Sequence, residues 1–227
     1  MTALGSITTV LLDLDGVVRH FDADHVHEVE RRHGLPHGCL SGAAFEPSLL
    51  QLVTTGRITR TEWTNRIGQT TGSHHAAQEW LAATGTVDTI VMGDVASLRD
   101  AGFQVALLTN GTDTTADEID DLRLGNMFDA VFNSADIGYA KPDRRIFEHA
   151  CHALGTHPSN VLFIDDSLAN VNAAAEIGIT ANLYDSTSFS ITVANLLATR
   201  PPQVKRPGWV CQIVGVTGLT AHWLLGS

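Results

Sequence analysis

The chain has 227 residues, of which 44% are hydrophobic and 17% are charged, a composition typical of a folded globular protein rather than a disordered one. This length can bury a substantial core, as one domain or as one domain with an insert. The formal net charge of −11 argues against a nucleic-acid partner, because phosphate backbones are bound by clustered Lys and Arg. The same charge would repel a phosphate substrate unless a cation reversed it locally.

The cysteines and the N-terminus bear on the compartment. Cys39, Cys151 and Cys211 are widely spaced, and an odd, sparse set does not build a disulfide framework. The first six residues lack the basic flank and the long apolar stretch of a signal peptide. We therefore expect a cytoplasmic protein.

Short apolar runs that end in polar residues recur along the chain. Such runs cover residues 7–12, 103–108, 130–132 and 161–164, and a weaker one covers residues 180–184. Because they do not alternate with polar residues, they are typical of strands covered on both faces, as in a parallel sheet. Helical patterns lie between them, over residues 90–98, 142–154 and 167–177. This alternation predicts a doubly wound α/β core of the Rossmann type, built from residues 1–16 and 87–199.

Residues 17–86 interrupt the alternation. They contain an apolar run at 49–53 and helix-like stretches around Trp63 and Trp80. We predict that they form a small helical cap domain inserted after the first strand, hinged near Val17 and Thr86.

The tail, residues 200–227, is of uncertain structure. Pro201-Pro202 would break any preceding helix. The following apolar part suits a docking strand, an oligomer contact or a poorly ordered end. Its polar Gln212 and His222 argue against a membrane span, so we expect no membrane partner. For the oligomeric state, we expect either a monomer or a homodimer.

Polar clusters follow four of the predicted strands, and the carboxyl ends of strands in an open α/β sheet meet in one crevice. Asp13 and Asp15 follow the first strand, and Asp165 and Asp166 follow another. Four convergent carboxylates repel one another unless a cation lies between them. Hard oxygen ligands select a hard cation, so the sequence predicts a Mg²⁺ site.

Other residues complete a set suited to phosphate chemistry. Lys141 places an ammonium group near a predicted helix start. Thr109, Asn110 and Gly111 offer a hydroxyl, an amide and main-chain N–H groups for phosphate oxygens. A carboxylate nucleophile, a cation, a lysine and hydrogen-bond donors are the groups that phosphoryl transfer in two displacement steps requires.

These motifs resemble those of the haloacid dehalogenase-like (HAD) hydrolases, in order and spacing, over residues 7–184. The matching segments are Asp13-Leu14-Asp15-Gly16-Val17, Thr109-Asn110-Gly111, Lys141-Pro142 and Asp165-Asp166-Ser167. The position of the insert, and the segment Gly56-Arg57-Ile58-Thr59 followed by Trp63, resemble the family's small helical cap.

The resemblance implies a role for each motif residue. Asp13 would be the nucleophile and a metal ligand. Asp15 would be the general acid and then the base, with its main-chain carbonyl on Mg²⁺. Thr109 and Asn110 would hold the phosphate, and Lys141 would pair with both Asp13 and the phosphate.

The rest of the metal shell is also implied by the resemblance. Asp166 matches the main distal metal ligand, and Asp165 a second or water-mediated one. Asn170 departs from the acidic residue often found at its position, which puts the outer metal shell in doubt.

The resemblance favours a Mg²⁺-dependent phosphatase that acts on small phosphorylated metabolites, such as sugar phosphates. The alternatives are a phosphosugar mutase, a haloacid dehalogenase of the same superfamily, and a non-catalytic binding protein on this scaffold. Asp15 favours a phosphatase over a dehalogenase, because dehalogenation needs no general acid. Candidates to line the cap entrance are Phe21, Phe45, Arg57 and Trp63.

Overall fold

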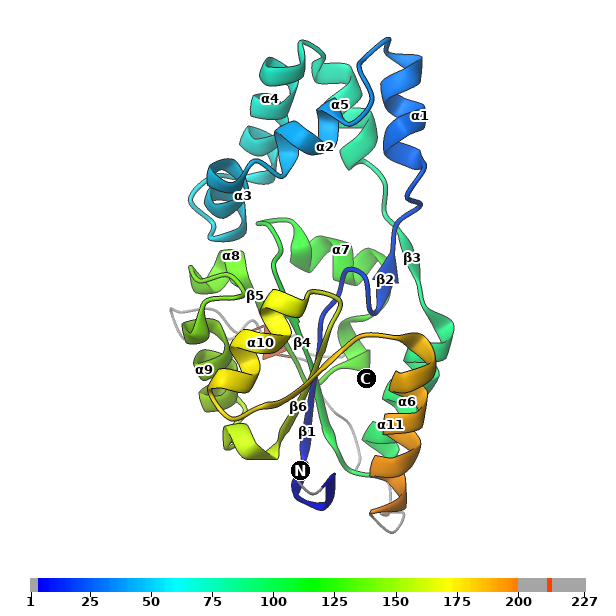
Figure 1. Cartoon of the computed structure of the whole chain (residues 1–227), viewed down its shortest axis with the longest axis vertical. Helices are drawn as coiled ribbons and strands as arrows, with labels where there is room; N and C mark the ends of the chain where they lie inside the picture. Colours follow the sequence, from blue (N-terminus) through cyan, green and yellow to red (C-terminus); the bar gives the residue numbers. More distant parts are fainter. Residues whose placement is uncertain (1–3, 200–211, 214–227) are drawn as a thin grey trace, which may run out of the picture.

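The computed structural model describes residues 4–199 and 212–213. Its lower part in Figure 1 is a parallel sheet with helices on both faces, and its upper part is a group of helices. The sheet has the order β7-β6-β1-β4-β5-β8. Its strands are β1 (Thr9–Leu12), β4 (Gln104–Thr109), β5 (Ala130–Asn133), β6 (Val161–Asp165), β7 (Thr180–Leu183) and β8 (Gln212–Ile213).

Each face of the sheet has its own hydrophobic cluster, so successive residues of β1 are all buried. Val10 and Leu12 pack on the face covered by α6 (Thr89–Asp100) and α11 (Ser186–Ala198). Leu11 packs on the opposite face, with residues of α9 (Arg144–Ala153) and α10 (Leu168–Glu176). Two shorter helices, α7 (Thr115–Asp121) and α8 (Ser134–Ile137), follow β4 and β5. The predicted doubly wound parallel sheet is confirmed.

The insert after β1 is helical, as predicted. Its helices are α1 (His25–Arg32), α2 (Cys39–Ala44), α3 (Pro47–Thr54), α4 (Arg60–Thr71) and α5 (His74–Leu81). They enclose a third hydrophobic cluster centred on Trp63 and Ile67. The indole N–H of Trp63 donates to the carbonyl of Ala44, 3.2 Å away, and so ties α4 to α2.

Two short strands connect the insert to the sheet. The strand β2 (Arg19–His20) pairs antiparallel with β3 (Thr86–Val87), with Arg19 opposite Val87. Strands of two residues have no periodicity that a sequence pattern could reveal, and this ribbon was not predicted. Its position near Val17 and Thr86 is compatible with our prediction that residues 17–86 form a cap domain hinged near those two residues.

The structure describes only Gln212 and Ile213 of the predicted tail. They form β8, which pairs in parallel with β5 at the sheet edge. The rest of residues 200–227 lies outside the described residues, as does Cys211. Within residues 4–199, Cys39 and Cys151 are free thiols. In the described part of the chain, no helix combines the length and the apolar character needed to cross a bilayer.

Candidate active site

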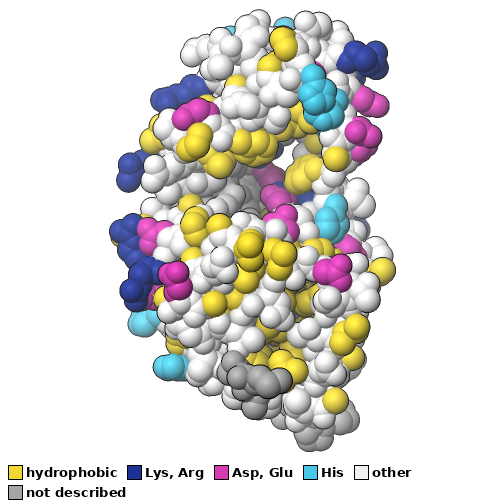
Figure 2. Space-filling model, in the orientation of Figure 1, with side chains coloured by type: hydrophobic (Ala, Val, Ile, Leu, Met, Phe, Trp, Pro, Cys, Tyr) yellow, Lys and Arg dark blue, Asp and Glu magenta, His cyan; other side chains and the backbone are white. Residues whose placement is uncertain are grey.

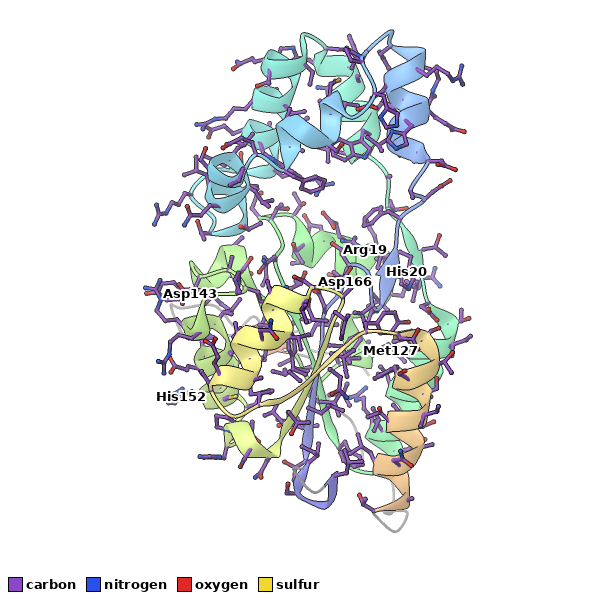
Figure 3. The ribbon with its side chains drawn as sticks, viewed as in Figure 1. Arg19, His20, Met127, Asp143, His152 and Asp166 are labelled. Atoms are coloured by element: carbon purple, nitrogen blue, oxygen red, sulfur yellow. The ribbon has the colours of Figure 1, made fainter. Side chains whose placement is uncertain are left out.

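Three adjacent strands, in the order β6-β1-β4, bring the candidate residues to one edge of the sheet. Asp13 follows β1, Thr109 ends β4 and Asp165 ends β6. The main-chain N–H of Asp13 donates to the carbonyl of Ile164 over 2.9 Å, which continues the pairing of β1 with β6. Figure 3 shows Asp166 at the edge of the sheet that faces the helical insert.

Lys141 lies at the centre of this edge, with its side chain only 1% exposed. Its ammonium nitrogen lies 2.8 Å from Asp13 Oδ1, 2.7 Å from Asp165 Oδ2 and 2.8 Å from the carbonyl of Leu108. Each of its three N–H donors therefore has an acceptor. The buried ammonium group is compensated by two carboxylates, and it joins the ends of β1, β4 and β6.

Asp165 is fully buried, and donors surround its carboxylate. Its Oδ2 faces Lys141, and its Oδ1 accepts from the main-chain N–H of Ser167 at 2.8 Å and from Asn170 Nδ2 at 2.9 Å. The hydrogen bond from Asn170 to Asp165 gives a physical reason why position 170 carries Asn and not the acidic residue often found there in the family. An amide there can donate to Asp165, whereas a second ionised carboxylate would repel it.

Asp166 is exposed and lies against Gly16. Gly16 has a φ of +90°, and a Cβ atom there would lie only 2.1 Å from Asp166 Oδ2. Glycine is therefore required at this position, both for the turn after Asp15 and for the approach of the Asp166 carboxylate.

One oxygen from each of Asp13, Asp165 and Asp166 lies within 4.8 Å of the other two. Burial raises the pKa of Asp13 to about 7, with Asp165 adding to the rise and Lys141 opposing it. Burial and the charge of Asp165 also raise the pKa of Asp166. Three carboxylates this close together, with hard oxygen donors, form a group that fits a divalent cation such as Mg²⁺.

The loop after β4 carries the candidate phosphate-binding residues. The side chain of Asn110 is engaged at both ends, because Nδ2 donates to the carbonyl of Lys141 and Oδ1 accepts from its N–H, both at 2.8 Å. A phosphate contact from Asn110 would therefore come through its main-chain N–H. A Cβ atom at Gly111 would lie 2.2 Å from Thr115 Oγ1, so only glycine allows this loop to pack so closely.

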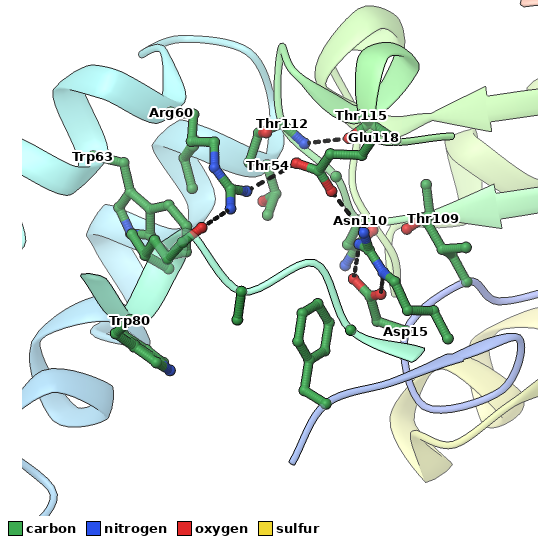
Figure 4. Close-up of a pocket in the computed structure, with 18 of the residues that line it drawn as sticks. Asp15, Thr54, Arg60, Trp63, Trp80, Thr109, Asn110, Thr112, Thr115 and Glu118 are labelled. Atoms are coloured by element: carbon green, nitrogen blue, oxygen red, sulfur yellow. Dashed lines mark hydrogen bonds and ion pairs between the residues drawn. The ribbon is translucent and has the colours of Figure 1, made fainter. Parts of the chain in front are cut away.

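Asp15 lies outside the group of three carboxylates and is paired instead with Arg19. Both of its oxygens accept from the Arg19 guanidinium, at 2.6 and 3.1 Å. Arg19 also donates to Glu118 on α7 at 2.8 Å, and Glu118 pairs with Arg60 on α4 at 3.1 Å. Figure 4 shows this chain of four alternating charges reaching from the sheet edge to the insert.

Glu118 is held ionised within this chain. Burial acts to raise its pKa, but the hydrogen bond from Arg19 and the charge of Arg60 hold that pKa below its ordinary value. Sequence reasoning missed Arg19, Arg60 and Glu118. The only local signal is the spacing of Arg19 four residues after Asp15, which fits no motif.

A pocket of about 500 Å³ lies between the sheet edge and the insert. Figure 2 shows the hollow, with acidic side chains at its floor and hydrophobic ones along its upper edge. The predicted candidates Phe21, Phe45 and Trp63 line it. Arg57 is not among its described lining residues, which include Arg60 and Trp80 instead.

The sequence model of the haloacid dehalogenase-like hydrolases matches residues 7–178, most of the chain. The chain belongs to this family. Membership confirms the resemblance seen in the motifs and makes the protein a HAD-like hydrolase, which is an enzyme family. It does not by itself fix the reaction.

The names of the relatives indicate more than one activity. The chain is 32% identical to (S)-2-haloacid dehalogenase 4A of Burkholderia cepacia over 82 residues, 36% of each chain. It is 23% identical to bifunctional epoxide hydrolase 2 of Rattus norvegicus over 226 residues, covering 89% of this chain but 41% of that protein. It is 28% identical to the phosphatase MT3486 of Mycobacterium tuberculosis over 193 residues, covering 79% of this chain and 88% of that one. The chain thus spans less than half the length of the first two.

Solved structures share the fold. A predicted HAD-like family hydrolase from Porphyromonas gingivalis has a TM-score of 0.70 at 22% identity, covering 85% of this chain and 98% of its own. The HAD family enzyme bt-2542 of Bacteroides thetaiotaomicron, in its magnesium complex, has a TM-score of 0.68 at 23% identity, covering 80% and 94%.

Proposed function

We propose that this chain is a Mg²⁺-dependent phosphatase that hydrolyses small phosphate monoesters through an aspartyl-phosphate on Asp13. The observation that carries the proposal is the placement of Asp13 between the Lys141 ammonium, at 2.8 Å, and the carboxylates of Asp165 and Asp166. The phosphatase named among the relatives and the magnesium complex of bt-2542 support it.

In the first step, an Asp13 carboxylate oxygen attacks phosphorus and the bond from phosphorus to the alcohol oxygen breaks. Asp15 gives its proton to that oxygen, so the alcohol leaves neutral. Lys141, the Thr109 hydroxyl and the main-chain N–H groups of Asn110 and Gly111 hold the phosphoryl oxygens. Asp13, Asp166 and the Asp15 carbonyl would hold Mg²⁺, which would supply positive charge beside the phosphoryl oxygens.

In the second step, water attacks the phosphorus of the aspartyl-phosphate and Asp15 accepts its proton. Inorganic phosphate leaves, and Asp13 is restored. Both oxygens of Asp15 are held by the Arg19 guanidinium, at 2.6 and 3.1 Å. In the first step Asp15 must carry a proton, so the bound substrate has to weaken that ion pair.

Asp165 has a different role in this scheme. Its carboxylate is occupied by Lys141, Ser167 and Asn170, so it fixes the position of Lys141 and contributes to the metal mainly through its charge. Asp166, which is exposed, is the distal ligand.

The test uses the full chain with 4-nitrophenyl phosphate and Mg²⁺, together with trapping of an acid-stable, hydroxylamine-labile phosphoenzyme. Asp13→Asn should abolish both signals. Asp15→Asn should slow turnover by about 10²–10⁴-fold, the usual contribution of general acid–base catalysis. Asp100→Asn, the same charge change at an exposed site on α6, should leave both intact.

A dehalogenase is the second candidate, because a named relative of 32% identity has that activity. It would use Asp13 as the nucleophile on carbon and release halide. Chloride release from 2-chloropropionate by the wild-type chain, without hydrolysis of phosphate esters, would decide for it and against the phosphatase.

A further inference from the structure

The pocket above the sheet edge has two chemically different ends. Its floor carries Asp15, Thr109, Asn110 and Gly111, the polar residues of the proposed phosphate site. The wall contributed by the insert and its connecting segments is mainly aromatic and aliphatic: Phe21, Phe45, Leu50, Val53, Trp63, Trp80 and Leu81. Phe21 and Phe45 are 45% and 54% exposed, so this wall is an uncovered apolar surface around a concavity.

The aromatic side chains of this wall are held by their neighbours. The rings of Phe45 and Trp80 meet edge to face, with centroids 6.1 Å apart at 86°. The guanidinium carbon of Arg19 lies 4.9 Å from the centroid of the Phe21 ring. These contacts place the rings before any ligand arrives, so a ligand that covers them loses little entropy in ordering them.

Several polar groups on the same wall already have protein partners. The Thr54 hydroxyl donates to the Leu50 carbonyl at 2.8 Å, and the Trp63 indole to Ala44. The Arg60 guanidinium donates to the Leu81 carbonyl at 2.6 Å and pairs with Glu118.

A sugar that filled the pocket would find the side-chain donors of Thr54, Trp63 and Arg60 already occupied. Each hydroxyl left unpaired on burial is unfavourable. His25, which also lines the pocket, has its Nε2 buried without a hydrogen-bond partner among the described residues.

We propose that the alcohol part of the substrate is an apolar aromatic or aliphatic body, and that Phe21, Phe45 and Trp80 select for it. This inference rests on the proposed phosphatase function and narrows its substrate class. The sequence favoured sugar phosphates as substrates, whereas this inference favours phosphate esters of apolar alcohols. A volume of about 500 Å³ is within the usual range of small-molecule sites, roughly 300–1,000 Å³.

The test is a series of primary alkyl phosphates, from ethyl to octyl phosphate, with glycerol 3-phosphate and glucose 6-phosphate as polar comparisons. The leaving group is a primary alcohol throughout the series, so differences in kcat/KM report contacts between the pocket and the alkyl chain. Burial of one methylene contributes ~0.8 kcal/mol, and a tenfold change corresponds to about 1.4 kcal/mol. Each added methylene should therefore raise kcat/KM by about fourfold until the pocket is full. Both sugar-type esters should be poorer substrates than hexyl phosphate.

Phe45→Ser should flatten the dependence of kcat/KM on chain length. The matched control is Ile191→Ser, which removes a similarly exposed side chain (57%) on α11, away from the pocket. Equal or better turnover of glucose 6-phosphate, or a flat series with active ethyl phosphate, would overturn the inference and leave the phosphatase function standing.

Binding to the Asp13→Asn chain, measured by calorimetry with Mg²⁺, separates the two proposals. Octyl phosphate should bind at least tenfold more tightly than glucose 6-phosphate. If the wild-type chain hydrolyses no phosphate ester, the phosphatase function fails, and these two affinities still decide for or against an apolar site.

Discussion

Arg19 binds both carboxylate oxygens of Asp15, with Nε 2.6 Å from Oδ1 and Nη2 3.1 Å from Oδ2. Arg19 is only 4% exposed and lies on β2, the first segment that crosses to the insert. Through Glu118 it connects Asp15 to Arg60 at the start of α4. The proposed acid–base residue is thus linked by charge to the helices that form the pocket wall.

Replacing Arg19 by Met keeps most of the side-chain length and removes its charge and donors. Asp15 and Glu118 then lose their shared partner, so the free energy of unfolding should fall by about 1–3 kcal/mol. Urea unfolding measures it, and Arg31→Met, at an exposed position on α1, is the control. If the two variants unfold alike, the ion pairs of Arg19 contribute no net stability.

The fold was predictable because the central strands β1, β4, β5 and β6 are buried on both faces. Residues such as Val10, Leu11 and Leu12 pack into different clusters, so the whole run must be apolar and stands out in the sequence. The polar residues that end these runs mark the strand ends. The convergence of Asp13 with Asp165 then follows from the parallel order of the strands.

Other features of the site depend on contacts between distant segments. Glu118 lies 99 residues from Arg19, and nothing in either segment marks them as partners. The orientation of Asn110 toward the Lys141 backbone depends on how two loops meet, 31 residues apart. The aromatic wall was predicted in part, since Trp80 could be assigned to a helix but not to a face of it.

The two aspartates after β6 should respond differently to loss of charge. Asp165→Asn leaves the buried Lys141 ammonium group with one carboxylate instead of two, and should destabilise the fold by roughly 3–5 kcal/mol, as breaking a buried ion pair does. Asp166→Asn changes an exposed side chain that the charge of Asp165 repels, so it should not destabilise the fold.

For Mg²⁺ binding we expect the opposite order, with Asp166→Asn having the larger effect of the two substitutions. Added Mg²⁺ raises the unfolding temperature of a protein that binds it only when folded. That rise should be lost in Asp166→Asn. A normal Mg²⁺ response in this variant, measured by calorimetric melting against EDTA-treated samples, would remove Asp166 from the metal site.

The raised pKa of Asp13 predicts how the metal-free protein responds to pH. Burial moves this pKa from 3.8 to about 7 on folding. Between these two values the unfolded chain releases a proton that the folded chain retains, so Asp13 lowers the free energy of unfolding as pH rises from about 4 to 7. Asp13→Asn removes this contribution.

Urea unfolding in EDTA at intervals from pH 4.5 to 7.5 measures the effect. The stability of Asp13→Asn relative to wild type should increase with pH over this window, while that of Asp100→Asn should not. Parallel curves for wild type and Asp13→Asn would mean that the buried carboxyl ionises at its ordinary pKa.

The contact between Gly56 and the core tests whether the insert must close on the sheet for activity. Gly56 precedes α4 with a φ of +68°, and a Cβ atom there would lie 2.2 Å from the carbonyl oxygen of Ala135 on α8. Gly72 ends α4 with a φ of +76° and has nothing within 4 Å of its Cβ position. Alanine at either position adopts a strained left-handed backbone, at a cost of about 1–2 kcal/mol, but only Gly56→Ala pushes the insert away from the core.

Because the insert has its own hydrophobic cluster, it can shift to relieve this clash without unfolding. A shift of this kind moves the pocket wall and Arg60 away from the sheet edge, and a displacement of about 1 Å can cost 10²-fold in rate. We therefore expect Gly56→Ala to lower kcat/KM for 4-nitrophenyl phosphate by about tenfold to a hundredfold, and Gly72→Ala to keep nearly full activity. Equal kcat/KM in the two variants, at matched stability, would show that the approach of Gly56 to Ala135 is not needed for turnover.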